Sequence, residues 1–224
     1  MSDPAGAAQR PITLYDYWRS SAAYRVRIAL NLKGLEYRQQ SVHLVRDGGQ
    51  QHSPDYVRLN PQHLVPTLIH GDQVLTQSLA IIEYLDECYP LLPLLPTEPL
   101  ARARCRALAQ VIACDVHPLN NLRVLKYLSQ TLQVADDARD AWYREWIARG
   151  FAAYEELLGQ EDGRYSCGKQ PSLADCCLVP QVYNAIRYQC DLEPYPRIRA
   201  VVDELQQLPA VAAAAPEQQA DANQ

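Results

Sequence analysis

The sequence predicts a two-domain protein, with a small α/β domain that holds a mixed sheet and an all-helical domain after it. The first half alternates between short apolar stretches typical of strands and stretches with one apolar helical face. The order β-α-β-α-β-β-α predicted there implies a mixed sheet with helices packed on it. Beyond residue 99 no segment has the pattern of a strand. Four prolines between Pro90 and Pro99 predict a stiff linker between the halves, because proline cannot continue a helix.

The predicted domains are residues 11–90 and 100–209, joined by the linker 91–99. A chain of 224 residues can bury a sizeable core in either one or two domains. We expect residues 1–10 to be disordered. The tail 210–224 is rich in alanine and glutamine, so we expect it to be frayed or disordered as well.

The first predicted strand and helix meet at a pair of serines. Ile12–Tyr17 is apolar and aromatic, as strands are, whereas Tyr24–Lys33 has one apolar helical face and ends before Gly34, a favoured residue after a helix. Ser20 and Ser21 therefore lie at a strand-to-helix turn. The free N–H groups and the dipole of a helix start favour an anion there, but serine is equally a preferred N-cap. On this segment alone the N-cap is the favoured interpretation.

The rest of the first domain contains a second helix-start serine. The further predicted elements are a strand Glu36–Leu44, a polar loop Arg46–Pro54, a short helix to Leu59, and strands Thr67–His70 and Gln73–Thr76 joined by Gly71-Asp72. We expect Ser78 to cap the next helix, which runs to Tyr89, and with Gln77 to form a cap or an anion site. Val65-Pro66 is an edge-strand proline or, if cis, exposes the Val65 backbone to a partner. Together these features predict a groove for an extended, anionic, peptide-like ligand.

The second half predicts four long helices. They are Arg102–Leu128, Asp136–Leu158, a helix that begins after Ser172, and Arg197–Leu208. Ser172 and Asp175 have the spacing of a capping box. We expect Pro118, which follows His117, to kink the first of these helices. Arg123 is six residues past His117, so this kink determines whether the two side chains face one pocket.

Composition excludes several other classes of protein. A formal charge of −5 with scattered basic residues argues against nucleic acid as a partner. Residues 1–10 do not resemble a signal peptide, and no apolar run is long enough to span a membrane, so we expect a cytoplasmic protein without a membrane partner. Seven cysteines without a Cys-x-x-Cys pair and five scattered histidines predict neither a disulfide scaffold nor a metal site. We expect most of the cysteines to be buried, reduced thiols.

These motifs resemble those of the cytosolic glutathione transferases, and within them the zeta class. Ser20–Leu30 matches the zeta signature of a serine pair followed by Cys-x-x-Arg-Val-Arg-Ile-Ala-Leu, except that Ala22 replaces the cysteine. Further matches are Asp47–Gln51, Leu64–Leu68, Gln77–Leu85 and Leu178–Val182. The resemblance covers the chain from Pro11 to Leu208. It implies a thioredoxin-like N-terminal domain, an all-α C-terminal domain and, by analogy only, a homodimer.

The resemblance implies glutathione-dependent cis–trans isomerisation of maleylacetoacetate to fumarylacetoacetate, a step of tyrosine and phenylalanine breakdown. In this mechanism the thiolate of glutathione adds to the cis double bond, the resulting single bond rotates, and elimination returns the trans isomer. One alternative is maleylpyruvate isomerase of the gentisate pathway. Another is a non-catalytic, transferase-like binding or regulatory protein. A detoxifying transferase is a third, although the candidate arginines favour an anionic substrate over an apolar one.

The resemblance also assigns roles to residues. It makes Ser20 the thiolate partner, with Ser21 as the alternative, and places Arg19 beside them in the catalytic centre. The implied glutathione-binding residues are Ser20, Ser21, Arg25, Gln51, Val65, Pro66, Gln77, Ser78, His117, Asn121 and Arg123. The implied contacts of the anionic substrate are Arg19, His117, Arg123 and Arg187. Without the resemblance, the favoured interpretation of each arginine is a solvated surface charge. The missing thiol at Ala22 should leave isomerisation intact, because glutathione supplies the nucleophile.

Within that glutathione set, the resemblance divides the tripeptide among three parts of the chain. Gln77 and Ser78 hold its γ-glutamyl end, Val65 holds its cysteinyl backbone, and Gln51 holds its glycyl end.

Overall fold

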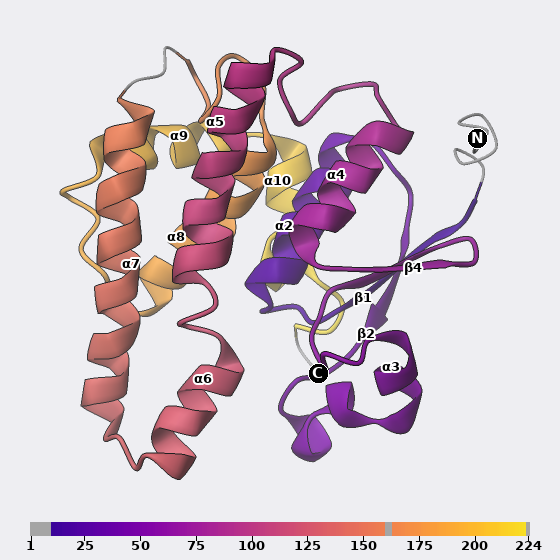
Figure 1. Ribbon diagram of the computed structural model, residues 1–224, viewed down its shortest axis with the longest axis vertical. Coiled ribbons are helices and arrows are strands. Elements are labelled where there is room, and N and C mark those ends of the chain that lie inside the picture. The colour runs from indigo at the N-terminus through magenta and orange to yellow at the C-terminus, as the bar shows by residue number, and fades with distance from the viewer. Residues whose placement is uncertain (1–9, 160–162, 223–224) are drawn as a thin grey trace. The chain divides into compact units, whose positions relative to one another are not determined.

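The computed structural model describes residues 10–159 and 163–222 and divides the chain into two compact units (Figure 1). The first unit consists of Met1–Leu95 with Leu208–Gln224, and the second is Pro96–Gln207. Residues 1–9, nearly all of the predicted disordered N-terminus, lie outside the described residues. Within the described ranges, no helix is both long and apolar enough to cross a membrane.

The first unit is built on a four-stranded mixed sheet, as predicted, with the order β2-β1-β3-β4. The strands are β1 (Ile12–Asp16), β2 (Arg38–Ser41), β3 (Thr67–His70) and β4 (Gln73–Thr76). β1 is parallel to β2 and antiparallel to β3, which forms the predicted hairpin with β4. The central strands hold the core residues Leu14 and Leu68, which are fully buried. β2 is shorter than the predicted Glu36–Leu44, and its residues pair with Thr13–Asp16 of β1.

Two helices lie side by side on the sheet, α2 (Ser21–Leu32) and α4 (Ser78–Cys88) (Figure 1). The apolar face of α2 is fully buried, and α2 ends as predicted at Gly34, which has φ 65°. The N–H of Leu35 donates to the carbonyl of Leu30, and that of Gly34 to Asn31, which is a Schellman motif. The loop after β2 contains the short turns η1 (Arg46–Gly48) and η2 (Gln50–His52) and the helix α3 (Pro54–Leu59).

The C-terminal tail is ordered, so our expectation of a frayed segment is wrong for residues 210–222. It forms α10 (Pro209–Ala213) and the turn η5 (Pro216–Gln218), and α10 packs on α2. Val211 and Ala214 are buried, and the side-chain amide of Asn31 donates to the carbonyl of Ala210 at 2.9 Å. The alanines are small and apolar enough to bury against α2, and α2 supplies donors for their carbonyls.

The second unit is helical, as predicted. Its elements are α5 (Pro99–Gln110), η3 (Val111–Val116), α6 (Leu122–Lys126), η4 (Tyr127–Thr131), α7 (Asp136–Leu158), α8 (Leu173–Arg187) and α9 (Pro196–Gln206). The predicted bounds of α7 are confirmed, and the last helix lies within two residues of its predicted span. The capping box is also present, since the Asp175 carboxylate accepts from the Ser172 N–H and hydroxyl, both at 2.7 Å.

The predicted helix Arg102–Leu128 is interrupted, which is more than the expected kink. After α5 the chain widens into the π-helical turn η3, where the His117 N–H donates to the carbonyl of Ile112 at 2.9 Å, and α6 begins only at Leu122. Pro118 lacks an N–H, and its ring would clash with a carbonyl of the preceding turn. α7 stabilises the interruption, because its Tyr143 carbonyl accepts from the buried Asn120 amide at 3.0 Å.

All seven cysteines are free thiols, but fewer are buried than we expected. Cys105, Cys176 and Cys177 are buried, whereas Cys88, Cys167 and Cys190 are partly exposed and Cys114 is exposed. The three buried cysteines lie on the buried faces of α5 and α8. The sequence pattern did not show that the other four lie outside such faces.

Candidate active site at one edge of the sheet

Strand direction brings four predicted motifs to the same edge of the first unit. β1, β2 and β4 run in one direction, since β1 is parallel to β2 and both β1 and β4 are antiparallel to β3. The ends of these three strands therefore share an edge with the start of β3. Ser20 follows β1, Gln51 follows β2, Val65 precedes β3 and Ser78 follows β4. In α/β sheets, ligands bind at the carboxyl ends of the strands.

Ser20 is the N-cap of α2. Its backbone is extended, and its Oγ accepts the N–H of Ala23 at 3.2 Å. Its own N–H donates to the Tyr17 carbonyl at 2.8 Å and closes a tight turn after β1. In this cap the Ser20 oxygen accepts a hydrogen bond. The hydroxyl proton of Ser20 can therefore still be donated to an anion. Ser21 is the first residue of the helix and is buried, which leaves Ser20 as the partly exposed hydroxyl of the pair.

Ser78 is not the cap of α4, contrary to our expectation. The N-cap position is Gln77, which has φ 70° and ψ 113° and makes no side-chain cap. The Ser78 Oγ instead accepts from Arg25 Nη1 at 3.2 Å, and both side chains are buried. Arg25 comes from α2, so one guanidinium links the beginnings of the two helices. Backbone in the left-handed region at a residue other than glycine is costly and is typical of functional sites.

The loop before β3 is held by buried hydrogen bonds. The Val65-Pro66 peptide bond is cis, and Val65 packs against Tyr17, Val42 and Tyr56. The carbonyl of Leu64 accepts from the Tyr56 hydroxyl at 2.6 Å and from the Asn60 amide at 2.8 Å. Burial raises the pKa of Tyr56, so its hydroxyl stays a protonated donor. These bonds fix the backbone that leads into Val65.

Gln77 is tied to the same loop. Its side-chain amide donates to Gln62 Oε1 at 2.8 Å, and the N–H of Gln62 donates to Asn60 Oδ1 at 3.0 Å. The Gln77 side chain is exposed, and its amide contact with Gln62 ties it to this loop.

Gln51 is buried, with its amide nitrogen 3.3 Å from the Leu44 carbonyl. Among the described residues, no donor reaches its Oε1. Gly49 lies against this amide with φ 107°, which residues with a side chain rarely adopt, and a Cβ there would lie 2.5 Å from Gln51 Nε2 and displace that amide, so glycine is favoured. A buried acceptor without a donor fits a ligand that carries N–H groups, as a peptide does.

The remaining candidates, apart from Arg19, lie in the second unit. Asn121 is the N-cap of α6 and accepts the Arg123 N–H at 3.1 Å, which is a structural role that the sequence did not indicate. The side chain of Arg123 is exposed, and His117 is half-buried at the end of η3. Arg187 is exposed in the last turn of α8, where it donates to Asn184 Oδ1 at 3.1 Å. As substrate contacts, these residues stay predictions.

Arg19 is exposed directly before Ser20, and its guanidinium lies 4.5 Å from the centre of the Trp18 ring.

The sequence did not indicate the residues whose hydrogen bonds hold the backbone of this edge, namely Tyr56, Asn60 and Arg27. Arg27 had a detectable signal, because it is a charged residue directly between two positions of the apolar run of α2. Tyr56 and Asn60 had none, since their partners are remote in sequence.

The fold and this site define a known family. Residues 10–87 match the family model "Glutathione S-transferase, N-terminal domain", and residues 121–215 match "Glutathione S-transferase, C-terminal domain". The chain therefore belongs to the glutathione S-transferase family.

Within the family, the similar proteins include maleylacetoacetate and maleylpyruvate isomerases. A "Probable maleylacetoacetate isomerase" of Vibrio cholerae is 54% identical over 211 residues, covering 94% of this chain and 98% of that protein. A maleylpyruvate isomerase structure, described as a bacterial zeta-class enzyme, is 50% identical with a TM-score of 0.90 and covers 93% and 99% of the two chains. A maleylacetoacetate isomerase structure from Anaeromyxobacter dehalogenans, with bound dicarboxyethyl glutathione and citrate, is 40% identical with a TM-score of 0.84 and covers 96% and 94%.

Proposed function

We propose that this protein is a glutathione-dependent cis–trans isomerase that converts maleylacetoacetate to fumarylacetoacetate. The observation that carries the proposal is the shared sheet edge, where Ser20, Val65 and Ser78 lie with a buried amide oxygen of Gln51 that accepts no hydrogen bond within the described residues. The identity to isomerases over almost the whole chain supports the same reaction.

Glutathione is a tripeptide with two carboxylates, and the edge offers a matching set of groups. The γ-glutamyl carboxylate binds at the start of α4, where the Ser78 hydroxyl and the helix amides are donors, with Gln77 beside it. The cysteinyl backbone lies along Val65 and Pro66, and the glycyl end lies at Gln51. Arg25 holds the Ser78 hydroxyl from behind, so its part in glutathione binding is indirect.

Bound glutathione supplies a thiolate that adds reversibly to the double bond of the substrate. The task of the protein is to keep this sulfur ionised. Lowering a thiol pKa from about 8.5 by about two units takes ~2.7 kcal/mol. A helix N-terminus contributes about 0.3–1 kcal/mol, and a hydrogen bond to a charged group about 1.5–3 kcal/mol. The amides of α2 alone do not lower the thiol pKa by this amount. A hydrogen bond from the Ser20 hydroxyl supplies the remaining free energy.

The substrate is a maleyl dicarboxylate, and cations are needed to bind it. Arg19, in the first unit, and His117, Arg123 and Arg187, in the second, are the proposed contacts. All three arginines have exposed side chains, so their charges are open to solvent and to a ligand. In this proposal residues 11–90 form the glutathione-binding domain and residues 100–209 the substrate-binding domain.

Maleylpyruvate isomerase is the second candidate, and a specific observation favours it. The similar structure with a TM-score of 0.90 is a maleylpyruvate isomerase, with an identity close to that of the Vibrio relative. Both substrates should therefore be assayed with glutathione at equal concentrations. A kcat/KM on maleylacetoacetate at least ten-fold above that on maleylpyruvate supports the first proposal, and the reverse ratio supports the second.

The same assay also addresses a non-catalytic role. Turnover of neither substrate by a protein that binds glutathione in a calorimeter would identify a binding protein. Absence of glutathione binding would overturn the proposed function altogether.

We also propose a cytoplasmic homodimer. The cytosol keeps glutathione reduced, as a thiolate mechanism requires. Leu91 and Leu92 expose 83% and 64% of their surface, and such apolar groups are often covered by a second subunit. Sedimentation equilibrium gives the mass in solution, and a monomer at all concentrations would refute the dimer.

A further inference from the structure

The C-terminal tail returns to the first unit beside the turn that carries Ser20. Figure 1 shows this segment, in yellow, next to α2 and ending near the edge of the sheet. Helix α10 packs on α2, and the chain continues through η5 to Asp221. None of the sequence motifs attributed a role to this segment.

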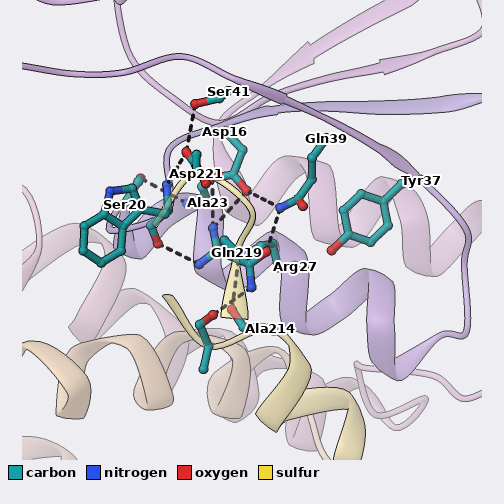
Figure 2. Close-up of polar contacts among 12 residues, drawn as sticks. Asp16, Ser20, Ala23, Arg27, Tyr37, Gln39, Ser41, Ala214, Gln219 and Asp221 are labelled. Carbon is teal, nitrogen blue, oxygen red and sulfur yellow. Dashed lines mark hydrogen bonds and ion pairs between the residues drawn. The ribbon is translucent and has the colours of Figure 1, made fainter. Parts of the chain in front are cut away.

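Arg27 connects the tail to the turn (Figure 2). It is fully buried, and its Nη1 donates to both carboxylate oxygens of Asp16 at 2.9 Å. Its Nε donates to the Ala214 carbonyl in the tail, and its Nη2 to the Trp18 carbonyl in the turn, both at 3.0 Å. Burial raises the pKa of Asp16, and the Arg27 charge opposes that effect. One guanidinium thus connects β1, the turn and the tail.

Asp221 holds the same turn from the other side. Its Oδ2 accepts the Trp18 N–H at 3.2 Å and the Ser41 hydroxyl at 2.8 Å. Gln219 fixes the approach of the tail, because its Oε1 accepts from Gln39 at 2.8 Å. The Gln219 amide nitrogen donates back to the Ala213 and Ala215 carbonyls at 3.0 and 2.7 Å. Figure 2 shows Asp16, Arg27, Gln219 and Asp221 gathered together, with Ser20 beside them.

Both backbone polar groups of Trp18 are therefore held, the N–H by Asp221 and the carbonyl by Arg27. Trp18 lies inside the turn that the Ser20 N–H closes onto the Tyr17 carbonyl. Fixing the peptide planes on either side of Trp18 fixes the direction in which Arg19 and Ser20 leave the turn. A hydroxyl must be placed within a fraction of an ångström to stabilise a developing or bound anion.

We propose that the C-terminal tail positions the thiolate-activating turn, with Asp221 and Arg27 as positioning residues that act through Trp18. This inference rests on the proposed function for the identity of the anion. The hydrogen bonds that connect the tail to the turn do not depend on it. When the Asp221 contact is lost, the Trp18 N–H is left without its carboxylate and the turn samples other orientations. The Ser20 hydroxyl then meets the sulfur less often.

The test compares Asp221→Ala, Asp221→Asn and a control, Gln218→Ala. Gln218 is exposed in the same tail segment, and its side chain makes none of the contacts described above. Two quantities are measured, hydrogen–deuterium exchange of residues 17–20 in the protein without glutathione and the pKa of bound glutathione from its thiolate absorbance. For Asp221→Ala we expect faster exchange and a pKa raised by about one unit, which from a bound-thiol pKa of about 6.5 lowers the thiolate fraction, and with it kcat/KM, about three-fold at pH 7. Asp221→Asn, which keeps an oxygen acceptor, should recover part of both.

Three results would overturn the assignment. In the first, Asp221→Ala keeps wild-type exchange and thiolate pKa. In the second, Gln218→Ala changes both as strongly. In the third, neither Asp221 variant folds, which would make Asp221 a support of the whole fold. Failure of the proposed function looks different, because wild-type protein would then lack turnover or glutathione binding while exchange at residues 17–20 still responded to Asp221→Ala.

Discussion

Replacing Ser20 with alanine tests the centre of the proposed site, because the structure gives this hydroxyl two separable roles. Its Oγ accepts the Ala23 N–H as the cap of α2, and its proton is the proposed donor to the thiolate. Loss of a serine cap costs about 1 kcal/mol of the free energy of unfolding. Loss of a hydrogen bond to a charged sulfur costs about 1.5–3 kcal/mol, which raises the pKa of bound glutathione by about one to two units.

Ser53→Ala is a matched control for the first role. Ser53 caps α3 in the same way, with its Oγ 3.3 Å from the Tyr56 N–H. Both variants should lose similar stability in urea unfolding, but only Ser20→Ala should raise the pKa of the bound thiol. Because the thiolate is the reactive form, kcat/KM for Ser20→Ala should recover as the pH rises through the new pKa.

The assay is a pH titration of thiolate absorbance in the glutathione complex, paired with a pH profile of kcat/KM. The reasoning is refuted if Ser20→Ala loses stability as Ser53→Ala does but keeps the wild-type thiolate pKa. In that case Ser20 is only a cap, and Ser21 or the helix amides ionise the thiol.

Three further substitutions test the surroundings of the site and the fold. Arg25→Met removes the donor to Ser78 Oγ, so KM for glutathione should rise about ten-fold with a smaller change in kcat, as steady-state kinetics would show. Gly49→Ala forces a Cβ against the Gln51 amide, and calorimetry should show weaker glutathione binding. Gly150→Ala places a Cβ 2.1 Å from Val116 Cγ2, so chemical unfolding should show a loss of about 1–3 kcal/mol.

Each of these three has a contradicting result. An unchanged KM for Arg25→Met would mean that the guanidinium does not orient the Ser78 hydroxyl. Wild-type affinity in Gly49→Ala would show that the Gln51 amide is not part of the glutathione site. For Gly150→Ala, adding Val116→Ala should restore part of the lost stability, and no recovery would place the strain elsewhere.

Local sequence signals predicted elements whose causes are themselves local. The bounds of α7, the capping box of α8 and the hairpin around Gly71 depend on residues within a few positions of each other. The end of α2 at Gly34 belongs to the same group, since a left-handed residue there closes the Schellman motif. The interrupted helix at Pro118 was predicted only as a kink, because contacts from α7 decided its form.

For the candidate site, the sequence by itself determined the residue types: two helix-start serines, a Val-Pro strand entry and an amide after β2. Only the tertiary structure showed that strand direction gathers them at one edge, that Arg25 rather than a cap bond holds Ser78, and that the tail reaches Trp18 through Asp221. The Asp221–Trp18 contact spans 203 positions of the chain. Caps and turns are set by neighbours along the backbone, whereas buried charges such as Arg27 are satisfied by whatever the packed fold brings to them.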